Sequence, residues 1–415
     1  MQDKQLYATI LGIQAPWHVT DVVLKADHQE VEIHVRHDDD VPLRCPQCRA
    51  VGPRHDHRER RWRHLDTCQY RTILVAAVPR IECPEHKVVQ VGLPWAEPGS
   101  RFTALMERLI IDWLLEANTA AVARQMRLTW HEIDGVKQRA VRRGLARRAL
   151  GEIRRLGVDE TAYQKRHEYV TVVSDLERGC VLYVADDRTH ASLDGFWPVL
   201  SAAQRDALEA IAMDMAPAYI RSAREHVPGA ERKICFDRFH VAKMLNDAVN
   251  TVRKEEHREL RAEGDSMLAG TKYVWTQNPE NMPAARRARF EELRDEALKV
   301  GRAWTLKEAA RGLWSYVSRA WAAKAWKHWI AWALRSRLAP MRYVAKTIRD
   351  MLWGIVNAIV LRVTNARAES LNARIQWIKK QACGYRSRER FKAAIFFHLG
   401  GLDLYPRPAL AHTKA

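Results

Sequence analysis

Three acidic residues stand in contexts that suit a metal-dependent site for cutting phosphodiester bonds. Asp159 and Asp214 each end a short apolar run of the kind that forms a buried strand, and Glu369 lies one turn into a basic, amphipathic helix. Mg²⁺ prefers hard oxygen ligands and keeps several waters, so a few carboxylates are enough to hold it. Two such ions about 4 Å apart activate the attacking oxygen, stabilise the leaving oxygen and neutralise the phosphate. The three acids therefore predict catalysis with two Mg²⁺ or Mn²⁺ ions.

The second acid is left open between two aspartates. Asp214 ends the strand that the element order assigns to this role, 55 positions after Asp159, whereas Asp237 lies 78 positions after it. Asp237 belongs to the more distinctive run that continues through Arg and Phe to His240. We favour Asp214 on strand order. Asp237 is then a supporting catalytic group or the N-cap of the following helix, and His240 and Asn372 are predicted to support the ligands.

An RNase H-like α/β core over residues 151–246 is predicted to position the aspartates. A short strand ends at Asp159, a hairpin follows, and two further strands end at Asp214 and Asp237 with a helix between them. The predicted elements, in chain order, are the strand Leu156–Val158, the hairpin strands Glu168–Val173 and Cys180–Ala185, the strand Ala210–Met213, the helix Ala218–His226 and the strand Lys233–Phe236. Ends of neighbouring strands are rigid points from which carboxylates converge.

The 155 positions between Asp214 and Glu369 require an inserted domain. Residues 247–362 are strongly helical in composition and hold eight of the fifteen tryptophans. We predict an all-helical insertion there, followed by the C-terminal helix of the core and a basic tail over 363–415. The tryptophans at 326, 329 and 332 are expected to pack a helical bundle; the alternative is a surface on which exposed bases stack.

Two matching ligand pairs predict a zinc ribbon within residues 1–98. Each pair separates its ligands by two residues and has a proline after the first, and the pairs are Cys45 with Cys48 and Cys83 with His86. Such turns aim two ligands at one point, and two turns complete the tetrahedron that Zn²⁺ prefers. One structural Zn²⁺ is therefore expected, with Cys68 a weaker candidate than His86 for the fourth ligand. The apolar runs Tyr7–Ile13, Asp21–Leu24 and Val31–Val35 are expected to be strands before the first pair.

A helix-turn-helix is predicted within residues 99–150. A helix carrying Val122, a turn at Met126–Leu128 and a second helix capped by Thr129 follow one another. Glu132 stands three residues after Thr129, which is the spacing of a capping box. The second helix of such a motif enters the major groove of DNA.

Cations near these motifs are predicted to contact DNA phosphates. They are Arg58, Arg60, Arg61 and Arg63 between the zinc ligands, Lys137, Arg139, Arg142 and Arg143 in the second motif helix, and Arg374, Lys379 and Lys380 in the helix of Glu369. The alternatives are a solvated hairpin tip for the first group, a simple three-helix pack for the second and a solvated basic tail for the third.

Bulk composition favours a nucleic-acid partner. The net charge is +18 and the pI about 9.8, and no apolar run approaches the length of a membrane span. The opening residues are polar, without the apolar region of a secretion signal. A hydrophobic content of 47% excludes wholesale disorder. The seven cysteines, two of them in a tight pair, suit a reducing cytoplasm and metal binding.

Together these motifs resemble the ISL-three family of transposases of bacterial insertion sequences. The resemblance covers most of the chain and is most specific in the Asp237-Arg-Phe-His240 run and in the segment from Asn365 through Glu369 to Asn372. One departure is His86, where the family's ribbon usually has cysteine. The fold class expected is multidomain α+β: a zinc ribbon, a helix-turn-helix, and an RNase H-like catalytic core interrupted by a helical insertion.

The resemblance implies a bacterial enzyme of the cytoplasm and nucleoid that binds terminal inverted repeats and target DNA and joins cut ends, with no membrane partner. A homodimer on double-stranded DNA is expected. Two other functions stay open: a catalytically inert DNA-binding regulator, and an RNase H-like nuclease. Intact carboxylates argue against the first, and the two additional DNA-reading modules argue against the second.

Overall fold

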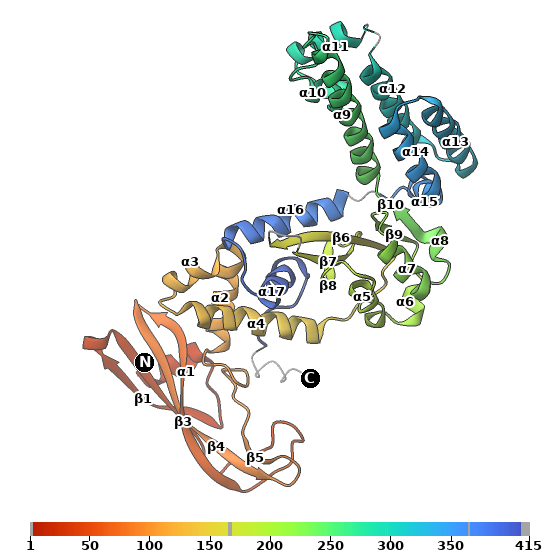
Figure 1. The fold of residues 1–415 in the computed structure, drawn as a ribbon. Coiled ribbons are helices and arrows are strands. Elements are labelled where there is room, and N and C mark those ends of the chain that lie inside the picture. The colour runs from red at the N-terminus through yellow and green to blue at the C-terminus, as the bar shows by residue number, and fades with distance from the viewer. Residues whose placement is uncertain (1–2, 165–167, 295, 297, 364–365, 408–415) are drawn as a thin grey trace. The chain divides into compact units, whose positions relative to one another are not determined.

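The computed structural model describes residues 3–164, 168–294, 296, 298–363 and 366–407, and the chain divides into two compact units (Figure 1). The first comprises the residues up to Arg148 and those from Leu402 onward, and the second is Ala149–Gly401. Two sheets and many helices alternate in a multidomain α+β arrangement, which confirms the predicted fold class. The finer domain boundaries drawn from sequence stay predictions. No helix in the described ranges combines the length and the apolarity needed to cross a membrane.

A sheet with strand order β1-β2-β4-β3, in which β5 pairs with β4, forms the N-terminal part of the first unit. Its strands are β1 (Trp17–Lys25), β2 (Glu30–His37), β3 (Arg54–Thr67), β4 (Tyr70–Cys83) and β5 (Lys87–Gln90), with the short helix η1 (Ala26–His28) between the first two. Trp17, Trp62 and Trp95 pack edge to face in its core. The expected strands over 21–24 and 31–35 are confirmed.

The expected strand Tyr7–Ile13 is wrong, because the chain forms helix α1 (Asp3–Leu11) there. Its apolar residues 6, 7, 10 and 11 recur at helical rather than alternating spacing. Gly12, at φ 62°, ends the helix in the left-handed conformation that glycine adopts without strain. α1 packs on β1.

The predicted helix-turn-helix is confirmed in the second part of this unit. Its helices are α2 (Ala104–Glu116), α3 (Thr119–Gln125) and α4 (Trp130–Arg147). The Thr129 hydroxyl accepts a hydrogen bond from the Glu132 N–H, and the Glu132 carboxylate accepts one from the Thr129 N–H at 2.8 Å. This capping box fixes the start of α4 and therefore the angle of the turn.

The second unit is built on a sheet with strand order β10-β9-β6-β7-β8. Its strands are β6 (Arg155–Gln164), β7 (Glu168–Asp175), β8 (Cys180–Asp186), β9 (Ala210–Met213) and β10 (Ile234–Phe236). β6, β7 and β8 are antiparallel neighbours, whereas β9 and β10 add in parallel on the other side of β6. The strand, hairpin, strand, helix and strand predicted for an RNase H-like core all occur in that order. One difference is that β6 continues beyond Asp159, because its second half pairs with β7.

Short helices connect these strands, and two longer ones follow the helical block. They are α5 (His190–Asp194), η2 (Trp197–Val199), α6 (Ala202–Asp206), α7 (Pro217–His226), α8 (Ala230–Lys233), α16 (Ala366–Gln381) and α17 (Arg388–Leu399). α16 and α17 cover the β6-β7-β8 side of the sheet, with Ile375 and Phe391 buried in one cluster with Val172.

A helical block follows β10, and its first helix begins at Arg238. Its helices are α9 (Arg238–Ala262), α10 (Lys272–Thr276), η3 (Pro279–Asn281), α11 (Ala284–Arg294), α12 (Lys299–Gly312), η4 (Leu313–Ser315), α13 (Arg319–Arg335), α14 (Ala339–Asp350) and α15 (Leu352–Leu361). Trp326 and Trp329 are buried, as the packing interpretation expects, but Trp332 is 44% exposed.

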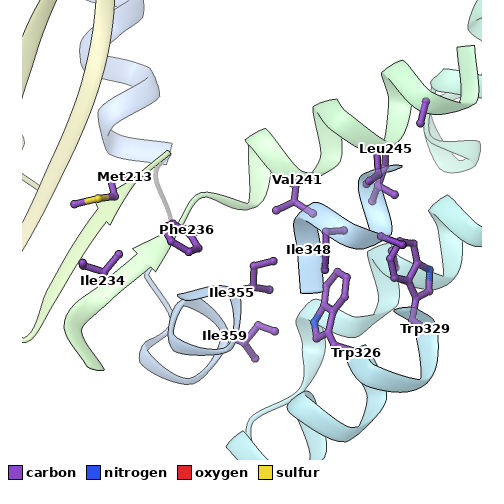
Figure 2. Close-up of a cluster of buried hydrophobic side chains, with 14 of the residues drawn as sticks. Met213, Ile234, Phe236, Val241, Leu245, Trp326, Trp329, Ile348, Ile355 and Ile359 are labelled. Atoms are coloured by element: carbon purple, nitrogen blue, oxygen red, sulfur yellow. The ribbon is translucent and has the colours of Figure 1, made fainter. Parts of the chain in front are cut away.

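One hydrophobic cluster joins this helical block to the sheet. Figure 2 shows Met213 and Phe236 from the strands beside Val241, Ile355 and Trp326 from the helices. The contact is tightest where α15 meets β10, because a Cβ on Gly354 would lie 2.5 Å from the buried Phe236 ring. The block and the sheet thus share a core.

The close approach at Gly354 predicts that alanine substitutions at two helical glycines have opposite effects on stability. Gly354→Ala should lower the free energy of unfolding by about 1–3 kcal/mol, since the added methyl overpacks the core against Phe236. Gly301→Ala is the matched control: its Cβ would meet no heavy atom of the described residues within 4 Å, so the change should raise stability by up to about 1 kcal/mol. Urea denaturation measures both. Equal midpoints for the two variants would contradict the shared core.

Candidate catalytic and zinc sites

The three aspartates lie at one level of three adjacent parallel strands. Ala212 of β9 is in register with Gly157 of β6 and with Cys235 of β10. Asp159, Asp214 and Asp237 each lie two residues after these positions, so all three are at the same edge of the sheet. Carboxyl ends of parallel strands are where α/β sheets gather functional groups.

Helix α16 lies along β6 and is tied to it by side-chain hydrogen bonds (Figure 1). Asn372 Nδ2 donates to Asp159 Oδ2 at 2.6 Å, and Gln376 Nε2 donates to the Thr161 hydroxyl at 2.6 Å. Glu369 precedes Asn372 by three residues and so shares its helix face. The structure therefore brings Glu369 to the Asp159 edge of the sheet across 210 positions. Asn365, which begins the sequence motif, lies outside the described residues.

The carboxyl groups at this edge influence one another electrostatically. Burial raises the pKa of Asp159 to about 6; the Glu160 N–H opposes this rise, and the nearby Asp237 and Asp214 add to it. Burial and the charge of Asp237 likewise raise the pKa of Glu369. A cluster of carboxylates that resist losing their protons is one in which a bound cation would offset the repulsion.

Asp214 and Asp237 differ in their local roles. The Asp237 carboxylate caps α9 by accepting a hydrogen bond from the Phe239 N–H at 3.0 Å, and its side chain is almost fully buried. His240 Nε2 lies 3.9 Å from the same carboxylate, one turn into the helix. Asp214 is half-buried and accepts a hydrogen bond from the Ala216 N–H. The capping interpretation of Asp237 is confirmed.

Several cations predicted to contact DNA instead pair with side chains of the first unit, and two of them, Lys137 and Arg143, are buried. Arg139 and Arg143 both pair with Glu107, which is only 1% exposed and needs opposite charge beside it. Lys137 is buried against Asp134 and the Thr119 hydroxyl.

Arg63 is also buried, bonded to Asp66 and to backbone carbonyls, and is therefore no phosphate contact. Arg61 is bound to Glu30 and Glu32 on the neighbouring strand, although its side chain is half-exposed. Lys379 donates to the Ala162 carbonyl at 2.9 Å and anchors α16 to β6. The members of the predicted set on the exposed surface with no such buried partner are Arg58, Arg60, Arg142, Arg374 and Lys380.

Two features near the predicted sites were not singled out from the sequence. Glu160, beside Asp159, is half-buried, and burial together with the charge of Asp214 raises its pKa. Residues 309–349 hold nine Lys or Arg and no Asp or Glu, and Lys324 and Lys327 lie on one face of α13. The acid-free composition of this run is a signal that sequence reading could have used.

The four predicted zinc ligands converge at the base of β4. All their ligand atoms lie within 4.8 Å of one another. The closest separations are 3.5 Å between the sulfurs of Cys48 and Cys83 and 3.6 Å between Cys83 Sγ and His86 Nδ1. A tetrahedron with Zn–S bonds of about 2.3 Å has edges of nearly this length. The His86 N–H lowers the pKa of the Cys83 thiol to about 6, which favours the thiolate that zinc binds. Cys68 is exposed and is not in the cluster.

The cluster predicts one zinc per chain with these ligands. Cys45→Ser together with Cys83→Ser should remove the metal, because two thiolates of the tetrahedron are lost. Cys68→Ser is the matched control and should keep it. Elemental analysis of the purified chains measures both, and zinc retained by the double variant would exclude the assignment.

Comparison with known proteins agrees with this geometry. A model of a transposase family, that of the ISL3 elements, matches residues 156–395. A zinc-finger model of the transposases of IS204, IS1001, IS1096 and IS1165 matches residues 42–86. A model of the helix-turn-helix domain of ISL3 transposases matches residues 92–141. The three models cover the zinc cluster, the DNA-binding helices and the carboxylate edge.

Two relatives extend the similarity over most of the chain. The transposase for insertion sequence element IS1001 of Bordetella parapertussis is 28% identical over 84% of this chain and 86% of its own length. The transposase for IS1557 of Mycobacterium tuberculosis (strain CDC 1551 / Oshkosh) is 25% identical over 97% of this chain and 96% of its own length. With the catalytic-domain model matching more than half of its residues, the chain belongs to the ISL3 (ISL-three) family of transposases, enzymes that act on DNA.

Proposed function

We propose that this transposase binds the terminal inverted repeats of an insertion sequence and catalyses Mg²⁺-dependent strand cleavage and strand transfer. The observation that supports it most is the convergence of Asp159, Asp214 and Asp237 at one sheet edge, with α16 carrying Glu369 to the same place. Phosphodiester chemistry requires such convergence, because metal-bridging carboxylates act on one phosphate.

The donor set fits Mg²⁺ or Mn²⁺. Carboxylate oxygens are the ligands these ions prefer. Burial raises the pKa of Asp159, the charges of Asp237 and Asp214 add to the rise, and a divalent cation would offset both effects. Asp159, Asp214 and Glu369 would hold two ions, which when bound supply charge neutralisation and an activated oxygen nucleophile.

The surrounding residues position these ligands. Asn372 donates to one oxygen of Asp159 and so fixes the orientation of its carboxylate. Asp237 is committed to capping α9 and is more buried than Asp214, so we assign Asp214 as the second metal ligand and Asp237 as a supporting group. His240, beside Asp237, would stabilise the negative charge at this edge.

The DNA partners are the inverted repeats and a target duplex, bound by a homodimer in the bacterial cytoplasm at the nucleoid. The exposed start of α4 would contact the base edges and so recognise the DNA sequence, as in other helix-turn-helix proteins. Arg58, Arg142, Arg374 and Lys380 would contact phosphates, and the acid-free run 309–349 would add to the non-specific affinity.

The assignment of the acids is tested by isosteric substitutions. Asp159→Asn, Asp214→Asn and Glu369→Gln should abolish cleavage of end DNA in Mg²⁺ while leaving DNA affinity unchanged or slightly higher. Asp237→Asn should reduce cleavage by about 10–100-fold, as expected for a group that supports ligands. Asparagine caps helices as well as aspartate does, so this variant keeps α9 intact.

Cleavage and joining are measured on labelled end DNA, with affinity measured in parallel. Loss of activity in Asp237→Asn with activity retained in Asp214→Asn would move the second ligand to Asp237. Cleavage without joined products would favour a nuclease, and binding without cleavage by the unmutated chain would favour an inert regulator.

Substitutions of two neighbouring arginines in α4 should have different effects, one on DNA binding and the other on stability. Arg142→Ala should weaken DNA binding and reduce the slope of log affinity against log salt by about 1, because one phosphate contact is lost. Arg143→Ala should lower the free energy of unfolding by about 3–5 kcal/mol, because it leaves Glu107 buried with less opposite charge. Salt titration of binding and denaturant unfolding of the full chain measure the two effects. A stability loss in Arg142→Ala similar to that in Arg143→Ala would overturn the distinction.

A further inference from the structure

A cavity of about 570 Å³ opens beside the carboxylate edge, within the second unit. Asp237 and Glu369 are among its lining residues. The rest of the lining comes from α9, Asn278, α12 with the segment around η4, and the end of α15. Leu245 and Ile359, two of the core residues labelled in Figure 2, form part of its apolar wall. Of the residues that line this cavity, the mechanism described above uses only these two acids.

Aromatic side chains line the cavity and remain accessible. Phe239 is 55% exposed and Tyr316 is 37% exposed, although both are large apolar groups. Trp314 is half-buried, with the Arg238 guanidinium 5.8 Å from its ring centre. Exposed aromatic faces next to a cationic group are what DNA bases stack upon in proteins that bind unpaired strands.

Polar groups in the cavity suit the edge of a base and its phosphate. The Asn246 Oδ1 atom is buried and has no hydrogen-bond partner within the described part of the chain, so it offers an acceptor to a ligand. Asn278 adds a second amide to the lining. Arg238 and Arg362 are exposed and add positive charge to the lining.

The volume and the position of the cavity indicate which kind of ligand it can bind. A cavity of this volume suits one small, largely flat ligand and is far too small for a duplex. Its lining includes two of the acids at which the DNA strand would lie, so a nucleotide of that strand is the group nearest to the cavity. A base enters such a cavity only when it has left the base stack.

We propose that this cavity binds one extrahelical nucleotide of the DNA strand at the catalytic edge, with Phe239 and Tyr316 stacking on its base. The proposal rests on the proposed function for the identity of the strand, but it concerns binding alone. Capture of an unpaired nucleotide would hold the adjacent phosphate at the carboxylates and distort the duplex there.

The experiment compares the affinities of the full chain for paired and mismatched end DNA. A single mismatch is moved through each position near the cleaved bond, and binding is measured by fluorescence anisotropy without a divalent metal. Because a mismatch removes most of the cost of unpairing, one position should bind about tenfold more tightly or better. The double variant Phe239→Ala/Tyr316→Ala should lose this preference.

Tyr343→Ala is the matched control, since Tyr343 is an exposed aromatic on α14 outside the cavity, and it should keep the preference. Both mutated side chains of the double variant are exposed, and thermal unfolding checks that its fold is intact. The proposal is overturned if no mismatch position improves binding, or if the double variant keeps the preference. Neither result would count against the proposed Mg²⁺-dependent cleavage. Failure of the acid substitutions to stop cleavage would instead refute the proposed function and would not refute nucleotide binding in the cavity.

Discussion

The convergence of like charges at one sheet edge is the constraint on which the second unit depends. Parallel pairing of β6, β9 and β10 puts three aspartates at one level, where burial, with the charges of Asp237 and Asp214 adding to it, raises the pKa of Asp159. Folding tolerates this because residues of all three strands are buried in one large apolar core. Under the proposed function, the same arrangement that costs stability would bind divalent cations, so the destabilising contact would also be the functional one.

The helical block matters to this site because it shares the core of the sheet. Gly354 allows α15 to approach the Phe236 ring, and residues of α9, α13 and α15 continue the cluster away from β10. The chain therefore leaves the sheet after Asp237, builds a bundle on its end, and returns at α16. Hydrogen bonds from Asn372 and Gln376 to β6 then fix the returning helix. A long insertion between two acids is compatible with a precise site because both of its ends are packed against the strands.

In the first unit, neighbouring arginines of one basic helix have different surroundings. Arg139 and Arg143 neutralise Glu107 in the interior, while Arg142 faces solvent. The high net positive charge therefore overstates the number of cations available to contact DNA, because some of them form ion pairs with buried acids. Residues from Leu402 onward add to the same unit, since the Leu404 carbonyl accepts from Arg143 and Tyr405 donates to Asp112.

The sequence by itself determined the elements whose signals are local. Ligand spacing located the zinc cluster, the Thr129 and Glu132 pair located the start of α4, and short apolar runs located the strands before Asp214 and Asp237, because caps, turns and knuckles depend on neighbouring residues. It did not determine which of two adjacent arginines is buried, or that a cavity adjoins the acids. Those depend on partners such as Glu107 or Phe236, which lie far away in the chain. Only tertiary packing decides which side chains meet, since burial and charge compensation are set by contacts that local pattern does not encode.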